Sequence, residues 1–399
     1  MKATVSRRLA ASSAIVAIAL PAIAVAMARR PHYGGTLRVE IGAAVASLEP
    51  SDDPGAREEI AACNQIDALL YESRDADGTF SGLQGSGPFR ISDWQPRKEL
   101  TLAANEKFGA GRPYVDGIEI AMNRAARDRL LDLELNKTDF AELAPQDARH
   151  AAERGVRVSV SQPDELVALI FVRSARNKTT PELREAVSVS IDRSAIANFI
   201  LQKTGEPANG LLPQWASGTE FLFAGSVTAP AGVSRAKELL GQMAAIPKLV
   251  LGYDSADPLA QAIAERIAVN AKEAGILIST LGLPAESAGR AGGLGQVDAV
   301  IERMRLPSAK PAEALDGILE AAAALTDIDS APLPGNASAQ DVLDRERGAL
   351  KAYRIVPLEW VPQVYGLSAR VRNWKAPRPG ETWPFADVWL DPSPPGTAQ

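Results

Sequence analysis

Short runs of alternating apolar and polar residues mark the stretch from 85 to 120. Residues 89–91 and 100–103 alternate with period 2, as half-buried strands do, and a turn of glutamine, proline, arginine and lysine separates them. The pattern therefore predicts a hairpin. After a loop that contains three glycine or proline residues, residues 115–120 are predicted as a third strand.

Helices and strands alternate in the middle of the chain. Residues 166–172 form a continuous apolar run, which is typical of a strand covered on both faces. Residues 248–253 and 276–280 are predicted strands on either side of a helix over 258–274, which Gly275 ends. Two strands joined by one such helix need a parallel crossover. The predicted fold class is therefore α/β.

Another helix is indicated by its N-terminal residues. Thr180 can cap a helix whose first residue is Pro181, the preferred place for proline. Its apolar residues recur at i, i+3, i+4, i+7 and i+8, which gives one buried stripe. A second helix is predicted over 193–202. The remaining predictions are helices from residue 127 and over 234–243, 312–325 and 339–352, and strands over 156–160, 297–301, 355–358, 364–367 and 385–390.

Residues 1–28 have the pattern of an export signal. Three basic residues form a head, residues 9–25 are almost wholly apolar, and small residues near the end of the segment suit cleavage. A pair of arginines in the head leaves secretory and twin-arginine export open. An uncleaved membrane anchor is the alternative, and the apolar stretch of 17 residues is short for it. We expect the mature protein in the periplasm.

The charge of the remaining chain argues against two classes of partner. The signal carries three of the 43 Lys and Arg residues and none of the 49 acids, so the mature charge is 40 minus 49, or −9. This balance disfavours nucleic acid and anionic lipid as partners. Cys63 is the single cysteine, so no intramolecular disulfide can form.

Motifs for catalysis and for cofactors are scarce in the sequence. The two histidines are His32 and His150, and the sequence has no His-Glu-x-x-His, Gly-x-Ser-x-Gly or paired-cysteine motif. The glycine-rich stretch 289–295 lacks the spacing of a dinucleotide-binding loop. We therefore expect no enzyme, no cofactor and no metal site.

The order of distinctive residues between 85 and 120 resembles that of a known family. Gly-Ser-Gly-Pro-Phe opens the stretch, Trp94 and Asn105 follow, and Gly-Arg-Pro-Tyr-Val-Asp-Gly-Ile stands at 111–118. This order is similar to that of the bacterial extracellular solute-binding proteins of family 5, which bind peptides, nickel or oligosaccharides for ABC importers. Further matches to this family are Gly-Gly-Thr-Leu-Arg-Val at 34–39, the two helices over 181–202, and Gly-Leu-Leu-Pro at 210–213.

The resemblance implies a two-lobe periplasmic-binding-protein fold of type II that closes by hinge motion. Lobe one would comprise residues 34–125 and 357–392, lobe two residues 126–356, and residues 393–399 a disordered tail. Family members usually insert a subdomain in lobe one, but only thirteen residues separate Tyr71 from Gly85. We therefore expect this subdomain to be missing and one surface loop to stand in its place.

The resemblance also points to candidate ligand-binding residues. In peptide-binding members, the strand equivalent to 297–301 leads to a Trp and then to an Asp-Pro, whose carboxylate pairs with the peptide amino terminus. This sequence places Lys310 at the Asp position, and Arg303 and Arg305 precede it. Cations at this place would repel an ammonium group and suit a carboxylate or a phosphate, so they predict an anionic or neutral solute. The alternative is a solvated basic loop.

Two aromatic residues are further candidates for the same cleft. Trp215 follows the proline-bearing loop at 210–213, and Tyr365 lies in the predicted return to lobe one. The tryptophans explained more simply by core packing are Trp360, Trp374, Trp383 and Trp389. Because aromatic residues make up only 5% of the chain, a dense sugar-stacking cleft is not indicated.

The resemblance predicts a monomer that captures a small peptide-like or anionic solute and delivers it to an ABC permease in the inner membrane. The alternative is an envelope sensor or accessory protein that kept the fold and lost ligand capture, which the missing subdomain and the altered Asp-Pro segment favour. An enzyme comes third, for want of catalytic motifs.

Overall fold

The computed structural model describes residues 30–47, 66, 87–173, 179–217, 232–284 and 294–392. By its internal contacts the chain divides after Pro31, and all helices and strands below belong to the unit that begins at His32. The predictions for the export signal, for Cys63, for the loop between Tyr71 and Gly85 and for the tail fall outside the described residues.

One mixed sheet runs through the protein in the order β2-β3-β4-β1-β5-β11-β6-β10-β8-β9, and β7 pairs with β11. We call β1 to β5 the first half of the sheet and β8 to β10 the second half. The strands are β1 Thr36–Glu40, β2 Phe89–Gln95, β3 Glu99–Ala104, β4 Gly117–Ala121, β5 Phe140–Leu143, β6 Arg157–Phe171, β7 Glu206–Pro207, β8 Leu249–Asp254, β9 Ile278–Leu283, β10 Ala299–Arg305 and β11 Ile355–Leu367.

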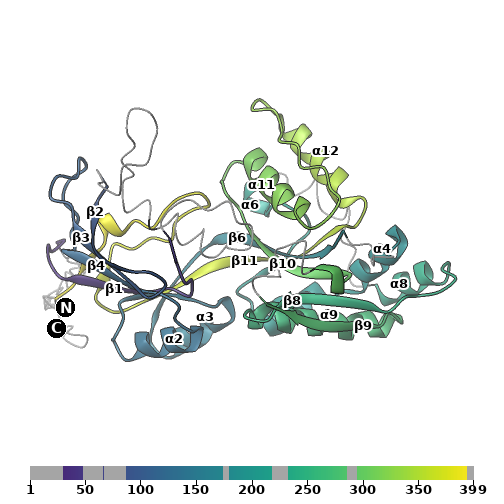
Figure 1. Ribbon diagram of the computed structural model, residues 1–399, viewed down its shortest axis with the longest axis horizontal. Helices are drawn as coiled ribbons and strands as arrows, with labels where there is room; N and C mark the ends of the chain where they lie inside the picture. The colour runs from purple at the N-terminus through teal and green to yellow at the C-terminus, as the bar shows by residue number, and fades with distance from the viewer. Residues whose placement is uncertain are drawn as a thin grey trace, which may run out of the picture. The chain divides into compact units, whose positions relative to one another are not determined.

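The two long strands β6 and β11 connect the halves (Figure 1). They pair with each other in antiparallel fashion; β11 continues against β5, and β6 continues against β10. The sequence pattern predicted two separate strands in each of these segments. The register of β11 against β6 shifts between Pro357 and Glu359 and on both sides of Pro362, and proline has no N–H to donate to a ladder. The alternation breaks there, while the strand itself continues.

The first half of the sheet has a core on each face. The predicted hairpin is confirmed as β2 and β3, which β4 joins in antiparallel pairing. One face packs against residues 371–390, which we call the C-terminal segment. The other face packs against α2 (Ala126–Glu134) and α3 (Ala148–Glu153). Residues 126–153 thus lie with the first half, because β5 pairs with β1, whereas the sequence division placed them in lobe two. That division into lobes stays a prediction.

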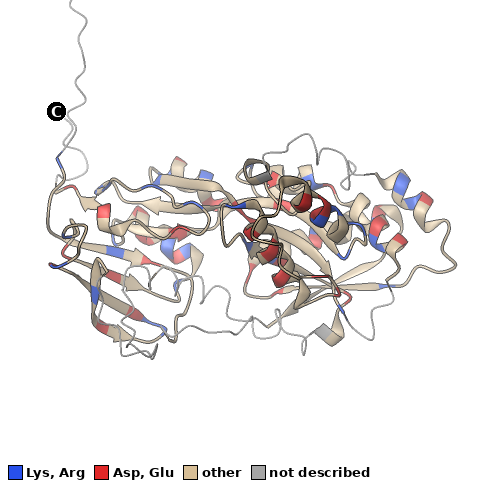
Figure 2. Cartoon of the chain, turned by 90° about the horizontal axis from the view of Figure 1, so that it is seen from above, with Lys and Arg blue, Asp and Glu red and all other residues tan. Residues whose placement is uncertain are grey.

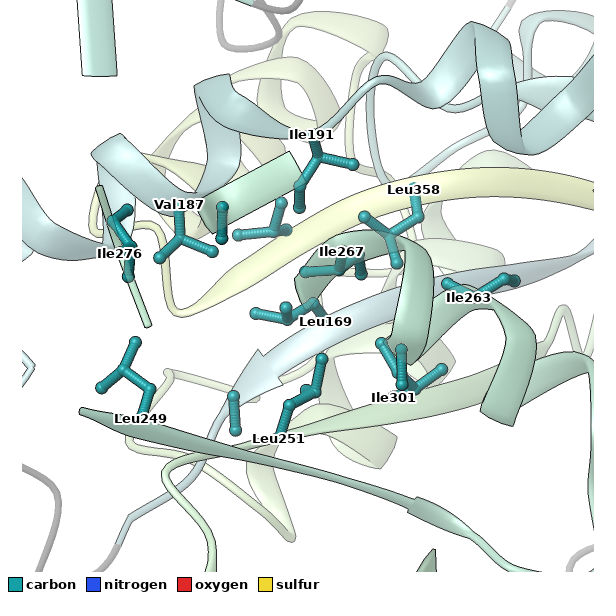
Figure 3. Packing of buried hydrophobic residues seen from close by; sticks show 14 of the residues in the cluster. Leu169, Val187, Ile191, Leu249, Leu251, Ile263, Ile267, Ile276, Ile301 and Leu358 are labelled. Atoms are coloured by element: carbon teal, nitrogen blue, oxygen red, sulfur yellow. The ribbon is translucent and has the colours of Figure 1, made fainter. Parts of the chain in front are cut away.

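The second half and β6 form a sheet between two layers of helices, and the continuous apolar run in β6 is covered on both faces as predicted. On one face, α4 (Pro181–Ser190), α8 (Val233–Leu240) and α9 (Pro258–Ala274) enclose a core that Figure 3 shows from close by. On the other face lie α11 (Pro311–Ala323) and α12 (Ala339–Leu350). The predicted parallel crossover is confirmed: β8 and β9 pair in parallel around α9, which Gly275 ends at φ 96°.

Two predicted elements are confirmed only in part. Residues 385–390 are a 3-10 helix, Phe385–Asp387, followed by β13 (Trp389–Leu390), because the Phe385 ring turns onto Phe140 at a centroid distance of 5.1 Å. The predicted helix over 193–202 is a short α-helix, Arg193–Ala195, and a π-turn, Ile196–Ile200. Positive φ values at Gln202 and Lys203, 50° and 68°, end the helical path before the predicted last residue.

Charged residues of both signs are interspersed over the described chain (Figure 2). No described helix combines the length and the apolar character that crossing a membrane requires. Among the described residues, no group of three or more His, Cys, Asp or Glu side chains is arranged to hold a metal ion.

A buried carboxyl group lies within β11. The Glu359 side chain is fully buried, and neither of its oxygens has a hydrogen-bond partner among the described residues. Burial raises the pKa of Glu359 to about 8; the nearby Arg193 lowers it, and Asp192 and Glu206 raise it further. Glu359 is therefore expected to be mostly protonated at neutral pH in the folded protein.

We expect the free energy of unfolding to fall as the pH rises from about 4.5 to about 8, because the unfolded chain releases the Glu359 proton in this window while the folded chain retains it. Glu359→Gln keeps the uncharged shape, so it should flatten part of this decline and exceed the wild type in stability near pH 8. Urea unfolding at several pH values measures both effects, with the exposed Glu119→Gln as control. The rest of the decline should remain in the variant, because burial also raises the pKa values of Glu40 and Glu346 to about 7. Equal slopes for wild type and Glu359→Gln would contradict the prediction.

Candidate ligand-binding site

Charged residues gather where β6, β10 and β11 meet at the crossing between the halves. The apolar run of β6 begins at Leu166, and Asp164 and Glu165 directly precede it. Glu165 lies opposite Arg305 of β10 on one side and opposite Val361 of β11 on the other. The register shifts of β11 fall at the same place. The crossing therefore brings side chains from three strands, and from loops beside them, to one location.

Arg303 is held by two carboxylates. Its guanidinium donates to Glu165 Oε2 at 2.6 Å and to Asp257 Oδ2 at 3.1 Å. Asp257 also caps α9, where its other oxygen accepts hydrogen bonds from the backbone N–H groups of Leu259 and Ala260. Burial lowers the pKa of Arg303, but the two carboxylates together raise it above the usual value. The charge of Arg303 is thus compensated within the protein, and the residue ties β10 to β6 and α9.

Arg305, unlike Arg303, is hydrogen-bonded to a neutral side chain. It donates to the neutral side-chain amide of Gln363, whose Nε2 in turn donates to Asp164 Oδ1 at 3.3 Å. Among the described residues, no carboxylate oxygen pairs with Arg305 within 4.0 Å. Desolvation by the surrounding protein lowers the pKa of Arg305, but nearby acids raise it above its usual value. The side chain is exposed to solvent.

Asp164 is the buried acid that accepts the hydrogen bond from Gln363. Its side chain is buried, and burial raises its pKa to about 6, while Arg305 lowers it. The Asp164 carbonyl oxygen accepts a hydrogen bond from the backbone N–H of Leu306 at 2.8 Å. The exposed charge at this point is therefore the Arg305 cation, whereas the Asp164 carboxyl group is buried.

Trp215 reaches the crossing from α6 (Gln214–Ser217), a short helix that follows β7. Its indole Nε1 donates to the carbonyl oxygen of Pro163 at 2.7 Å, one residue before Asp164. The ring is partly buried against the core beside α11 and α12. This hydrogen bond satisfies the polar end of the indole and fixes the orientation of the ring.

Tyr365 approaches the crossing from the first half. It lies opposite Glu142 of β5 and Ser159 of β6, and its ring stacks on Phe140 at 5.4 Å. The side chain is 4% exposed, and burial raises the pKa of its hydroxyl. Tyr365 thus belongs mainly to the aromatic core of the first half, beside Arg305.

Lys310 lies apart from this group. Its side chain is 76% exposed, and its Nζ pairs with Glu313 Oε1 at 2.7 Å in the first turn of α11. Such an exposed pair contributes little energy. The structure therefore brings four of the five candidate residues to the crossing and places Lys310 in a solvated ion pair.

The geometry of the crossing can be compared with known proteins. Residues 46–320 match the family model described as bacterial extracellular solute-binding proteins, family 5 Middle. The chain belongs to this family. The resemblance seen in the sequence is thereby confirmed.

Curated members of family 5 match over shorter stretches. A probable D,D-dipeptide-binding periplasmic protein of Escherichia coli is 26% identical over 132 residues, which cover 33% of this chain and 26% of that protein. A nickel-binding protein of Staphylococcus aureus is 27% identical over 125 residues, 31% of this chain and 26% of that protein. Each alignment thus spans about a quarter of the relative's length.

Solved structures of the family share the fold over most of the chain. The oligopeptide-binding protein AppA from Bacillus subtilis, in complex with a nonapeptide, has a TM-score of 0.64 at 14% identity, covering 91% of this chain and 100% of that one. The periplasmic binding protein DppA from Helicobacter pylori, in complex with the peptide STSA, has a TM-score of 0.69 at 13% identity, covering 90% and 99%. The fold is therefore the mixed α/β fold of family 5 periplasmic binding proteins.

Several residues of the site were missed by the sequence reasoning. Glu165 and Asp164 could have been found as two acids directly before a fully apolar strand. Glu346 of α12 could have been found as an acid within the buried stripe of its helix. Its Oε1 accepts hydrogen bonds from the backbone N–H groups of Leu211 and Leu212, which holds the loop that leads to Trp215. Gln363 carried no sequence signal, because its role depends on pairing across the crossing.

Proposed function

We propose that this member of family 5 captures a small solute at the crossing of β6 and β11 and delivers it to an ABC permease. Family membership and the likeness to solved binding proteins support capture as the activity. The observation that carries the proposal is Arg305, an exposed cation of β10 whose guanidinium donates to the neutral amide of Gln363, with Trp215 and Tyr365 at the same crossing.

The ligand proposed is anionic or neutral, and peptide-like in its size. Arg303 is occupied by Glu165 and Asp257, so Arg305 is the cation that can meet a ligand carboxylate. A ligand ammonium group would meet the same cation first, because Asp164 is buried beneath it. A charge-assisted hydrogen bond to Arg305 is the interaction that a carboxylate gains and an ammonium group does not.

Calorimetry with two pools of dipeptides tests this proposal. N-acetylated dipeptides keep the carboxylate and lack the ammonium group, and C-amidated dipeptides have the reverse. Preferential binding of the acetylated pool supports the proposed function. Binding of neither pool would favour the second candidate, an envelope sensor or accessory protein. The pairing of Arg303 with a carboxylate and the solvent exposure of Lys310 support this candidate.

Export to the periplasm is part of the proposal, since relatives in the family include periplasmic proteins. We expect residues 1–28 to be removed, so that mass spectrometry of the envelope fraction finds an N-terminus near residues 27–29. The basic head, the apolar stretch and the small residues before that point are the reason. Recovery of an intact Met1 in the inner membrane would show an uncleaved anchor instead.

A further inference from the structure

Pro307 lies between two glycines that come from different halves of the protein. A Cβ atom on Gly317 of α11 would meet Pro307 Cγ at 2.5 Å. A Cβ atom on Gly380, in the C-terminal segment, would meet the Pro307 carbonyl oxygen at 2.7 Å and Ser308 Cα at 3.4 Å. The chain can approach this closely only because neither position carries a side chain.

Gly380 belongs to a defined turn of the first half. Its φ is 78°, the backbone N–H of Arg378 donates to Glu381 Oε2 at 3.0 Å, and the N–H of Glu381 donates to the Arg378 carbonyl oxygen at 2.9 Å. Trp374 and Trp383, on either side of this turn, pack on Phe140 of β5 at centroid distances of 4.7 and 5.8 Å. The turn is therefore fixed to the core of the first half.

Pro307 belongs to an equally fixed turn of the second half. Leu306 is buried and bonded to the Asp164 backbone, and the Ser308 hydroxyl donates to Glu313 Oε2 at 2.7 Å while it accepts from the N–H of Lys310. Arg305 is two residues before Pro307. A displacement of Pro307 is therefore transmitted along a short, constrained stretch to the cation of the proposed site.

We propose that the Gly380 turn is a latch that holds the first half against the Arg305-bearing end of β10. This inference rests on the proposed function, because it gives the contact a role in closing the site over a ligand. The strands β6 and β11 connect the halves through the backbone, whereas the contact of Gly380 with Pro307 requires the two turns to lie against each other, and we take it as the contact of the closed arrangement. Closure then orders the Pro307 turn and Arg305 together.

Matched alanine variants test the latch. Gly380→Ala adds a methyl group against Pro307, and Gly155→Ala is its control, because Gly155 has a similar φ of 86° with no atom within 4 Å of the added group. Gly317→Ala displaces Pro307 from the other side without positive φ, and Gly348→Ala in α12, with open space around it, is the control for a helical glycine. Should Gly380→Ala fail to fold, Gly317→Ala still reaches the same contact.

Small-angle scattering and hydrogen exchange without ligand give the readouts. We expect both latch variants to have a larger radius of gyration than their controls, and the non-proline amides of residues 306–310 and 378–381 to exchange about tenfold faster. Unchanged scattering, with faster exchange confined to the substituted turn, would overturn the latch and leave passive packing.

The ligand readout separates this inference from the proposed function. If the acetylated dipeptide pool binds the wild type, Gly380→Ala should weaken that binding while Gly155→Ala does not. If the pool does not bind the wild type, the proposed function fails, and scattering and exchange still decide whether the contact holds the halves together.

Discussion

Arg305→Ala is expected to weaken binding of the N-acetylated dipeptide pool by about 10- to 150-fold, the loss of one charge-assisted hydrogen bond. The side chain lies at the crossing with its charge available, and its partner among the described residues is the neutral amide of Gln363. Removing it would leave a carboxylate at the proposed site without this cation. Isothermal titration calorimetry of the wild type and the variant measures the change.

Lys310→Ala is the matched control for this prediction. Lys310 is only five residues further along the chain, but it is exposed and paired with Glu313, so its removal should leave the affinity unchanged. The combined variant should then equal Arg305→Ala alone. A wild type that prefers the amidated pool, with an affinity that neither substitution alters, would show that the basic segment is solvated surface.

Arg303→Met is expected to lower the free energy of unfolding by about 3 kcal/mol, near the lower end for breaking a buried ion pair. The substitution keeps most of the volume of the side chain and leaves Glu165 and Asp257, whose side chains are only 11% and 16% exposed, without their shared cation. The lower end is chosen because Arg303 itself keeps 26% of its side chain exposed. Urea unfolding at neutral pH measures the difference.

Arg173→Met provides the comparison, because Arg173 pairs with Asp327 at 3.3 Å and both side chains are more than half exposed. Its loss should cost no more than about 1 kcal/mol. Adding Glu165→Gln to Arg303→Met should recover part of the stability, since it removes one of the uncompensated charges. A cost for Arg303→Met as small as that for Arg173→Met would mean that solvent screens the triad.

Arg303 and Arg305 differ in role although both lie on β10. Arg303 fixes the end of β10 to β6 and to the start of α9, and so provides a rigid base. Arg305, two residues further, donates to Gln363 of β11 and is the cation that we propose binds the ligand. The same short segment then continues into Pro307 and its contact with Gly380.

The sequence by itself determined most of the local structure, because the signals were local. The hairpin of β2 and β3, the capped helix at Thr180 and the crossover around α9 follow from periodicity, caps and a terminal glycine within a few residues of each element. Family membership also rests on residues that keep a fixed order along the chain, and the family model confirms it.

The tertiary structure decided what the charged residues do. From the sequence, Arg303, Arg305 and Lys310 were three equivalent cations in one segment. Their different environments depend on Glu165 and Asp257, on Gln363 and on Glu313, and the first three of these lie far away in the chain. Electrostatic roles depend on burial and on partners across strands, so only the paired strands could show which of the three cations remains available to a ligand.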